Sequence, residues 1–229
     1  MNKVVVITGA TGGLGKVVAQ AFAERGDSLV LLGRNQAHLD SLARELNLPL
    51  DRIHTQAVDL FDSRPLHSAA EAVSVKFGAV HILLHLVGGW TGGKTIPETA
   101  PADFNAMLDQ HAHTTFNLFQ AFVPHVIKSG WGRVLTISAP VAAHPVAKRG
   151  AYAAGKAAQE ALFLTLAEEL KGTGVTSNVI VVNTIDVEHK GSGTTPEEIV
   201  AAILHLCSVE AAKINGTRLP LYKKNKPRH

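Results

Sequence analysis

A short apolar run near the start of the chain passes directly into a glycine-rich segment. The apolar residues Val4 to Ile7 precede the sequence T-G-A-T-G-G-L-G, which runs from Thr8 to Gly15. A buried strand that turns sharply into a helix needs glycines, because a residue without Cβ permits the tight turn and the close approach of two backbone segments. The segment therefore predicts a strand-turn-helix unit of the kind found in doubly wound α/β sheets.

The same alternation of apolar runs and amphipathic or alanine-rich segments continues to the end of the chain. We expect strands at 3–8, 28–33, 53–58, 80–87, 133–138, 177–182 and 216–221, and helices at 14–25, 36–46, 63–77, 101–129 (broken), 152–171 and 196–209. Several of the strands are almost continuously apolar, as is typical of a parallel sheet covered on both faces. The pattern predicts an α/β fold with a doubly wound parallel sheet in one domain.

Composition excludes several classes of protein. A chain of 229 residues that is 46% hydrophobic can bury a core as one domain. No apolar stretch reaches the roughly 18 residues that span a bilayer, and Val4 to Ile7 is too short for a signal peptide. Cys207 is the only cysteine, so no internal disulfide can form. We expect a cytoplasmic protein without a membrane partner.

The formal charge of +3 comes from the last seven residues, which carry Lys223, Lys224, Lys226 and Arg228. Without those four side chains, 18 basic residues face 19 acidic ones. We therefore expect one domain over 1–222 and a solvated basic tail over 223–229. Aromatic residues make up only 5% of the chain, so nucleic acid is not expected as a partner.

The glycine-rich segment is suited to a dinucleotide. Gly9 permits the tight exit from the strand, Gly13 lets the backbone approach a pyrophosphate, and Gly15 lets the helix pack closely on the sheet. The free N–H groups and the dipole at the helix N-terminus favour phosphate charge. The alternative, a glycine-rich turn without a ligand, explains neither the position of the segment nor its flanking elements.

The second expected strand indicates which dinucleotide is bound. NAD-binding proteins usually place an acidic residue at its end, but Leu31 to Asn35 contains no carboxylate. Arg34 could instead bind a 2′-phosphate through a forked, charge-assisted contact, which favours NADP(H) over NAD(H). As an alternative, Arg34 is an ordinary surface arginine. Asp59, after the third strand, is placed to accept from the adenine amino group or to cap a helix.

A second motif, Y-A-A-G-K, lies far downstream. On a helix, Tyr152 and Lys156 lie one turn apart on the same face. An ammonium there stabilises the phenolate and is expected to lower the pKa of the tyrosine toward the working pH. The pair is then a general acid that can protonate an acceptor while a nicotinamide delivers hydride.

Together the two motifs resemble those of the short-chain dehydrogenase/reductase (SDR) family, T-G-x-x-x-G-x-G and Y-x-x-x-K, in order and separation. The resemblance covers essentially the whole chain. It implies a Rossmann-type sheet of about seven strands, a nicotinamide cofactor, Tyr152 as proton donor and Lys156 on the nicotinamide ribose. It also implies a homodimer or homotetramer formed through the long helices that contain His111 to Ile127 and Ala151 to Leu170.

The chain departs from the family pattern at the catalytic serine. The family's serine precedes the tyrosine by 13 residues, and here that position is Ala139. Ser138 lies one residue earlier, and neighbouring strand residues point to opposite faces. A one-residue shift in the following loop could bring Ser138 to the site. The family's asparagine on the helix after the fourth strand corresponds to His111, which either holds a water or is a polar interface residue.

A glycine-tryptophan run, from Gly88 to Gly93, is similar to a segment of dihydropteridine reductases. That enzyme type also lacks the usual serine and reduces an electron-poor quinonoid pterin. Trp90 could stack on a flat heteroaromatic substrate, or it could be a packing residue in a loop. Against a close match, such enzymes generally favour NADH, whereas Arg34 favours NADPH.

The expected site is therefore as follows. The catalytic candidates are Tyr152, Lys156 and Ser138, and the substrate candidates are Trp90, Ala139 and His111. The expected cofactor contacts are Gly9, Thr11, Gly13, Leu14, Gly15, Arg34, Asn35, Asp59, Leu60, Val87, Gly88, Gly89, Tyr152 and Lys156. No metal is expected, because the sequence has neither H-E-x-x-H nor a cysteine-histidine ligand set.

Two functions remain open at the level of sequence. The first is an NADPH-dependent reductase of a small conjugated or heteroaromatic acceptor, pterin-like or quinone-like. The alternative is a dinucleotide-binding sensor or assembly protein without catalysis. Ala139 and His111 favour the alternative, whereas the intact pair of Tyr152 and Lys156 favours the enzyme.

Overall fold

The computed structural model describes residues 2–222, so the predicted basic tail at 223–229 lies outside the described residues. Its seven strands form one sheet in the order β3-β2-β1-β4-β5-β6-β7, and every neighbouring pair is parallel. The strands are β1 (Val4–Thr8), β2 (Ser28–Gly33), β3 (Ile53–Ala57), β4 (Ile82–His85), β5 (Gly132–Ser138), β6 (Val175–Val181) and β7 (Arg218–Pro220).

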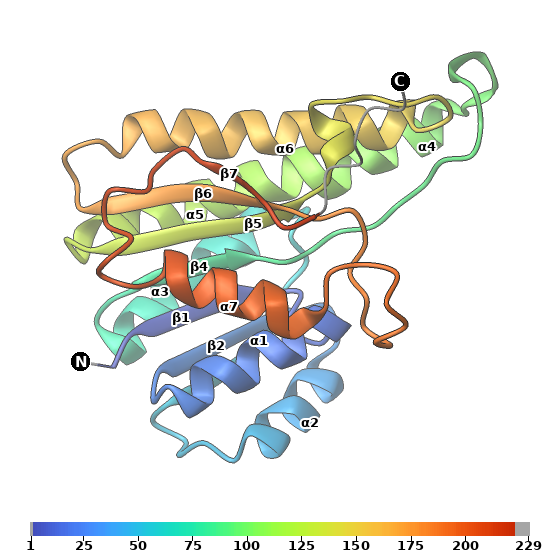
Figure 1. The fold of residues 1–229 in the computed structure, drawn as a ribbon. Coiled ribbons are helices and arrows are strands. Elements are labelled where there is room, and N and C mark those ends of the chain that lie inside the picture. The colour runs from blue at the N-terminus through green and yellow to red at the C-terminus, as the bar shows by residue number, and fades with distance from the viewer. Residues whose placement is uncertain (1, 223–229) are drawn as a thin grey trace.

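Helices cover both faces of the sheet (Figure 1). The longer helices are α1 (Gly13–Glu24), α2 (Gln36–Leu46), α3 (Ser63–Phe77), α4 (Pro101–Leu108), α5 (Thr114–Lys128), α6 (Gly150–Glu169) and α7 (Pro196–Leu206). Short 3₁₀ turns lie at η1 (Ile96–Glu98) and η3 (Pro140–Ala142), and η2 (Asp109–His113) is a turn of π-helix.

Alternation along the strands divides the core into two clusters. In β1, Val4 and Val6 face the cluster under α3, α5 and α6, whereas Val5 and Ile7 face the cluster under α1, α2 and α7. Successive side chains of a strand point to opposite faces, so a strand covered on both sides must be apolar throughout. This explains the continuous apolar runs and confirms the predicted doubly wound α/β fold of Rossmann type.

The predicted helix over 101–129 is divided into three parts. α4 ends at Leu108, η2 widens the helix over one turn, and α5 continues from Thr114. Such π-turns often occur at functional sites, because they insert a residue into a helical face. Here the widened turn brings His111 into the interior, beside α6.

Strand order reverses between β1 and β4, since the chain adds β2 and β3 on one side of β1 and the remaining strands on the other. Ligands of open parallel sheets bind beyond the carboxyl ends of the strands at such a switch point. The fold therefore places the glycine loop after β1 and the residues after β4 and β5 around one crevice. Within residues 2–222, no helix is long and apolar enough to cross a membrane.

Candidate active site

In the glycine loop between β1 and α1, the start of the helix packs closely on the backbone that leaves the strand. Gly9 has a φ of +72°, a conformation that other residues rarely adopt. A Cβ on Gly15 would lie 2.2 Å from the Gly9 carbonyl oxygen, so only glycine fits there. The N-cap of α1 is Gly12, no side chain caps the helix, and its first turn carries no acidic residue. The N–H groups at this helix start are therefore available to an anion, as a dinucleotide pyrophosphate requires.

A pocket of about 280 Å³, here called the β2–β3 pocket, opens beside the glycine loop where β2 and β3 end. Seven of the predicted cofactor residues line it, namely Gly9, Thr11, Arg34, Asp59, Leu60, Val87 and Gly88. The predicted residue Asn35 does not line it. Its side chain instead accepts a hydrogen bond from the backbone N–H of His38 (3.0 Å) and so caps α2.

A larger cavity of about 740 Å³, here called the central cavity, lies beyond the carboxyl ends of β1, β4, β5 and β6. It shares five lining residues with the β2–β3 pocket, so the two form one continuous crevice around the glycine loop. The shared residues are Gly9, Gly12, Leu86, Val87 and Gly88. An elongated crevice with a phosphate-binding helix start at its middle suits a dinucleotide.

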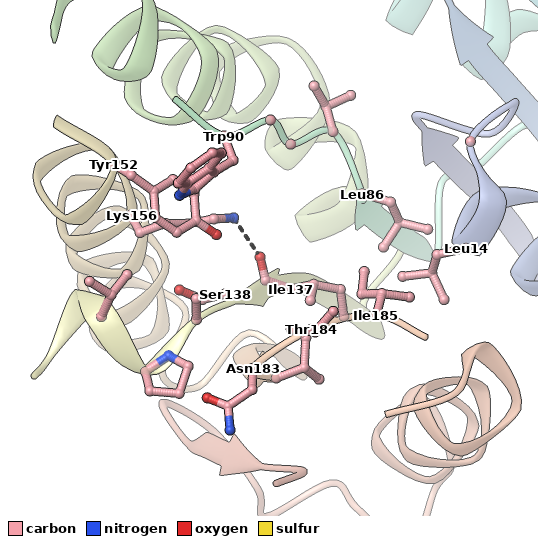
Figure 2. Close-up of a pocket in the computed structure, with 18 of the residues that line it drawn as sticks. Leu14, Leu86, Trp90, Ile137, Ser138, Tyr152, Lys156, Asn183, Thr184 and Ile185 are labelled. Carbon is pink, nitrogen blue, oxygen red and sulfur yellow. Dashed lines mark hydrogen bonds between the residues drawn. The ribbon is translucent and has the colours of Figure 1, made fainter. Parts of the chain in front are cut away.

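Lys156 is buried in the wall of the central cavity, on α6. Its ammonium donates to the carbonyl oxygen of Ile137 at 2.9 Å (Figure 2). It also donates to Oε1 of Gln159 at 2.9 Å. Burial lowers the pKa of Lys156 to about 8, and the charge of Glu160 acts in the opposite direction. The side chain is thus fixed by two acceptors and still carries a proton near neutral pH.

Tyr152 lies one turn before Lys156 and also lines the central cavity. Burial raises the pKa of its phenol above the ordinary value, and the charge of Arg149 lowers it to a smaller extent. This is opposite to the direction expected from the motif, because burial of the phenol is the largest influence on its pKa. A phenol with a raised pKa is protonated at neutral pH, the state of a proton donor.

The sequence left open whether Ser138 could take the place of the family's catalytic serine, and the end of β5 bears on this question. The strand extends to Ser138, and Ala139 keeps an extended backbone (φ −130°, ψ 152°), so the loop contains no shift of register. Ala139 packs with Val141 and Ala153 against Tyr152. Ser138 nevertheless lines the central cavity, and its buried Oγ has no hydrogen-bond partner within residues 2–222.

His111 lies in the π-turn behind the cavity wall and does not line the cavity. Its Nε2 is 3.1 Å from the carbonyl oxygen of Gly89, and its ring meets the ring of Tyr152 edge-on at 5.6 Å. Burial, with the charge of Lys156, lowers the pKa of His111 to about 3. The imidazole is therefore neutral, with a proton on Nε2 for Gly89, and it holds the glycine-tryptophan run against α6.

His85, at the end of β4, is a second neutral imidazole. Its Nδ1 is 2.8 Å from Oγ1 of Thr8, and Thr136 donates to its backbone oxygen at the same distance. Complete burial lowers its pKa to about 3. These contacts connect three neighbouring strands at the switch point and fix the position of the residues that follow β4.

The lining of the central cavity includes the predicted substrate candidate Trp90. It also contains three exposed side chains that the motifs did not identify, namely His144, Val146 and Arg149. Arg149 could have been found from its spacing, because it precedes Tyr152 by one helical turn. Gln159, which holds the ammonium, could have been found in the same way from its distance to Lys156.

The segment after β6 closes the other side of the cavity, where Figure 2 places Asn183, Thr184 and Ile185 opposite α6. The carboxylate of Asp186 accepts the backbone N–H groups of Lys190 (2.9 Å) and Ser192 (3.1 Å), which folds the segment into a compact loop. A Cβ on Gly13 would lie 2.9 Å from Cγ1 of Val187. The loop therefore packs directly on the glycine loop.

Comparison with known proteins gives matches over most of the chain. The family model described as short chain dehydrogenase matches residues 3–198. D-threitol dehydrogenase of Mycolicibacterium smegmatis is 28% identical, over 95% of this chain and 90% of that protein. Sulfoacetaldehyde reductase 2 of Chromohalobacter salexigens is 32% identical, over 76% and 69%. A short chain dehydrogenase structure from Bacillus anthracis has a TM-score of 0.85 at 29% identity, covering 96% of this chain and 94% of that one.

Proposed function

The chain belongs to the short-chain dehydrogenase/reductase family of NAD(P)(H)-dependent oxidoreductases, and from that premise we propose that it reduces a small conjugated or heteroaromatic acceptor with NADPH. The observation that carries the proposal is the protonated phenol of Tyr152, next to a fixed ammonium and on the wall of a large cavity. Burial raises the pKa of this phenol, which favours its role as a proton donor, so the direction we propose is reduction.

The residues present fit a dinucleotide along the whole crevice. The helix start at Gly12 would hold the pyrophosphate, and the β2–β3 pocket would hold the adenosine end. Lys156, now held by Ile137 and Gln159, would donate to the nicotinamide ribose. When bound, the reduced nicotinamide supplies a hydride, and Tyr152 supplies the accompanying proton, so that the acceptor gains two electrons and two hydrogens.

Arg34 supports NADPH over NADH. It lines the β2–β3 pocket with Thr11 and Asp59, and no other charged side chain of residues 2–222 lines that pocket. Asp59 is engaged by its own turn, since its Oδ1 accepts the backbone N–H of Phe61 at 3.0 Å. The guanidinium is thus the group available to a 2′-phosphate.

The acceptor class follows from the catalytic end of the crevice. Ala139 supplies no hydroxyl beside Tyr152, and Ser138 lines the cavity with its Oγ buried. A site with reduced hydrogen-bonding to the acceptor oxygen suits an electron-poor ring more than a simple ketone. Trp90, at the mouth, offers a flat face for such a ring, either a pterin or a quinone.

We further propose a cytoplasmic homodimer or homotetramer formed through α5 and α6. The exposed side chains of Phe116 and Ile127 lie along a surface groove with Phe119, Val123 and Leu162. A contiguous apolar groove on two long helices is a surface that a second copy of the chain would cover. Sedimentation equilibrium tests this, because Phe116→Glu should shift the protein to monomers.

The test of the function is NADPH and NADH oxidation with a panel of acceptors, including quinonoid dihydropterin, quinones and simple ketones. We expect turnover of the pterin or the quinones, and little turnover of ketones. Tyr152→Phe should lower turnover by a factor of about 10² to 10⁴ while NADPH affinity stays nearly unchanged. The matched control is Tyr222→Phe, because Tyr222 is the chain's only other tyrosine. Equal losses of turnover and affinity in Tyr152→Phe would contradict the assignment.

A further inference from the structure

The mouth of the central cavity has an uneven distribution of charge. Two basic side chains, Arg149 and His144, line it beyond Tyr152. No aspartate or glutamate is among the residues that line this cavity in the described part of the chain. A cavity of this size with cationic groups and no carboxylate attracts negative charge and repels positive charge.

Arg149 has no partner of its own in residues 2–222. Its guanidinium forms neither an ion pair nor a side-chain hydrogen bond there, although Arg149 is the N-cap residue of α6. A nearby cation, Lys94, is by contrast paired with Asp103 at 3.4 Å. The five N–H donors of Arg149 are thus available, and a guanidinium binds carboxylate, sulfonate or phosphate oxygens through paired hydrogen bonds.

Arg149 and Tyr152 are three residues apart at the start of α6, which brings the guanidinium near the phenol. The carbonyl oxygen of Arg149 accepts the N–H of Ala153 at 2.8 Å, so Arg149 and Tyr152 follow one another along the first turn of the helix. Side chains three apart lie on the same face, roughly 5–6 Å between their Cβ atoms. The charge of Arg149 acts on the phenol of Tyr152 and opposes the burial that raises its pKa. A small molecule can therefore contact both residues at once.

The wall between them is apolar. Pro140, Val141 and Val146 line the cavity together with Arg149 and the exposed ring of Trp90. Such a surface suits the body of a flat molecule, with a small number of polar groups to orient it. Tyr152 and Arg149 supply polar groups to this same cavity.

We propose that the natural acceptor is an organic acid, whose anionic group Arg149 binds at the cavity mouth, with His144 as a second donor, while Tyr152 faces the atom that is reduced. The inference rests on the proposed function, because it concerns the substrate of the same site. It adds a property that neither the glycine loop nor the tyrosine motif specifies. Of pterin-like and quinone-like acceptors, it selects those that carry a carboxylate, sulfonate or phosphate.

The test compares 1,4-naphthoquinone with its 2-sulfonate in NADPH oxidation by the wild type, Arg149→Gln and Lys148→Gln. Lys148 is the matched control, since it is a neighbouring exposed cation that does not line the central cavity. Intrinsic reactivity differs between the quinones, so the quantity to compare is the ratio of their kcat/KM values across variants. We expect Arg149→Gln to lower the ratio of sulfonate to neutral quinone about tenfold, through KM, and Lys148→Gln to change it less than twofold.

A binding measurement keeps the anion site testable apart from turnover. Calorimetric titration of 2-naphthalenesulfonate and the uncharged 2-naphthalenesulfonamide into the protein with NADP⁺ needs no reaction. Tighter binding of the sulfonate that is lost in Arg149→Gln supports the anion site, even if neither quinone is reduced and the proposed function fails. Equal binding of the two compounds to the wild type, or equal loss in Arg149→Gln and Lys148→Gln, overturns it. Reduction of both quinones with an unchanged ratio in Arg149→Gln overturns the inference and leaves the proposed function standing.

Discussion

The two ends of the crevice are built in different ways. At the nucleotide end, the geometry comes from backbone, since Gly9 and Gly15 shape a loop in which their nearest neighbours are backbone atoms. At the catalytic end, the geometry comes from side chains, and burial sets the protonation of Tyr152 and Lys156. A backbone site tolerates no added atom, whereas a side-chain site can exchange one donor for another.

This difference explains why one motif is intact and the other is surrounded by departures from the family pattern. A Cβ at Gly9 or Gly15 would meet backbone atoms, which cannot move aside. Around Tyr152, by contrast, the changes to Ala139 and His111 leave packed contacts with the phenol ring. The substitutions that follow measure how far each end tolerates change.

The largest effect is expected at the nucleotide end, from Gly15→Ala. Alanine normally stabilises a helix by up to about 1 kcal/mol relative to glycine, but here its Cβ would lie 2.2 Å from the carbonyl oxygen of Gly9. We expect the clash to exceed that gain and to lower the free energy of unfolding by about 3 kcal/mol, with NADPH affinity reduced more than 100-fold.

Urea titration and fluorescence titration with NADPH measure the two quantities. Gly33→Ala is the control, because its added Cβ would lie 3.4 Å from Leu39, an ordinary contact. Full NADPH affinity in Gly15→Ala would show that the loop can relax, and that the distinction between the two ends is wrong.

The second prediction concerns the loss of folding stability at low pH, which depends on two buried histidines near the catalytic end. Burial lowers the pKa of both His85 and His111 to about 3, below the ordinary 6.5. Between these values the unfolded chain binds more protons than the folded one, so stability is lost as pH falls from 6.5 toward 3. Each histidine contributes a slope of about 1.4 kcal/mol per pH unit in that window.

Urea titrations at pH 6.5 and pH 5 test this. The loss of stability between the two values should be smaller in His111→Asn than in the wild type, by about 2 kcal/mol. His67→Gln, at an exposed position on α3, should keep the full loss. If His111→Asn retains the wild-type pH dependence, His111 is not the buried neutral imidazole that we describe.

Restoring a hydroxyl beside Tyr152 is expected to have a smaller effect. Ala139→Ser adds one oxygen where Ala139 now contacts the tyrosine ring, and a donor there would bind a developing oxyanion. We expect reduction of simple ketones to rise about tenfold, with quinone reduction nearly unchanged. Ser138→Ala should instead lower quinone reduction, since Ser138 is the one serine of residues 2–222 that lines the cavity. Steady-state kinetics measure both activities. If Ala139→Ser reduces ketones no faster than the wild type, a hydroxyl at position 139 does not act as the family's catalytic serine.

The smallest effect is expected from Arg34→Gln. Arg34 is exposed, so solvent screens its contact with a 2′-phosphate. We expect NADPH to bind about fivefold more weakly, and NADH to bind as before. Arg64→Gln, at another exposed arginine on α3, is the control. Parallel changes in the affinities for both dinucleotides would remove the basis for an NADPH preference.

The sequence by itself determined the fold and the family. Apolar runs in a parallel sheet and glycines in a tight loop are local requirements, so residue patterns predict them directly. The predicted strands and helices match closely in type and order, and α2 and α3 match in both bounds. The family resemblance, taken from the two motifs, is confirmed by the family model over 3–198.

Tertiary structure decided what the motifs could not. The π-turn that buries His111 depends on packing between η2 and α6, not on a local pattern. The pKa of Tyr152 shifts opposite to the expected direction, because burial of the phenol in the folded chain raises it. Spacing places two side chains on one face, but desolvation depends on everything packed around them. Protonation at this site is therefore a property of the folded chain.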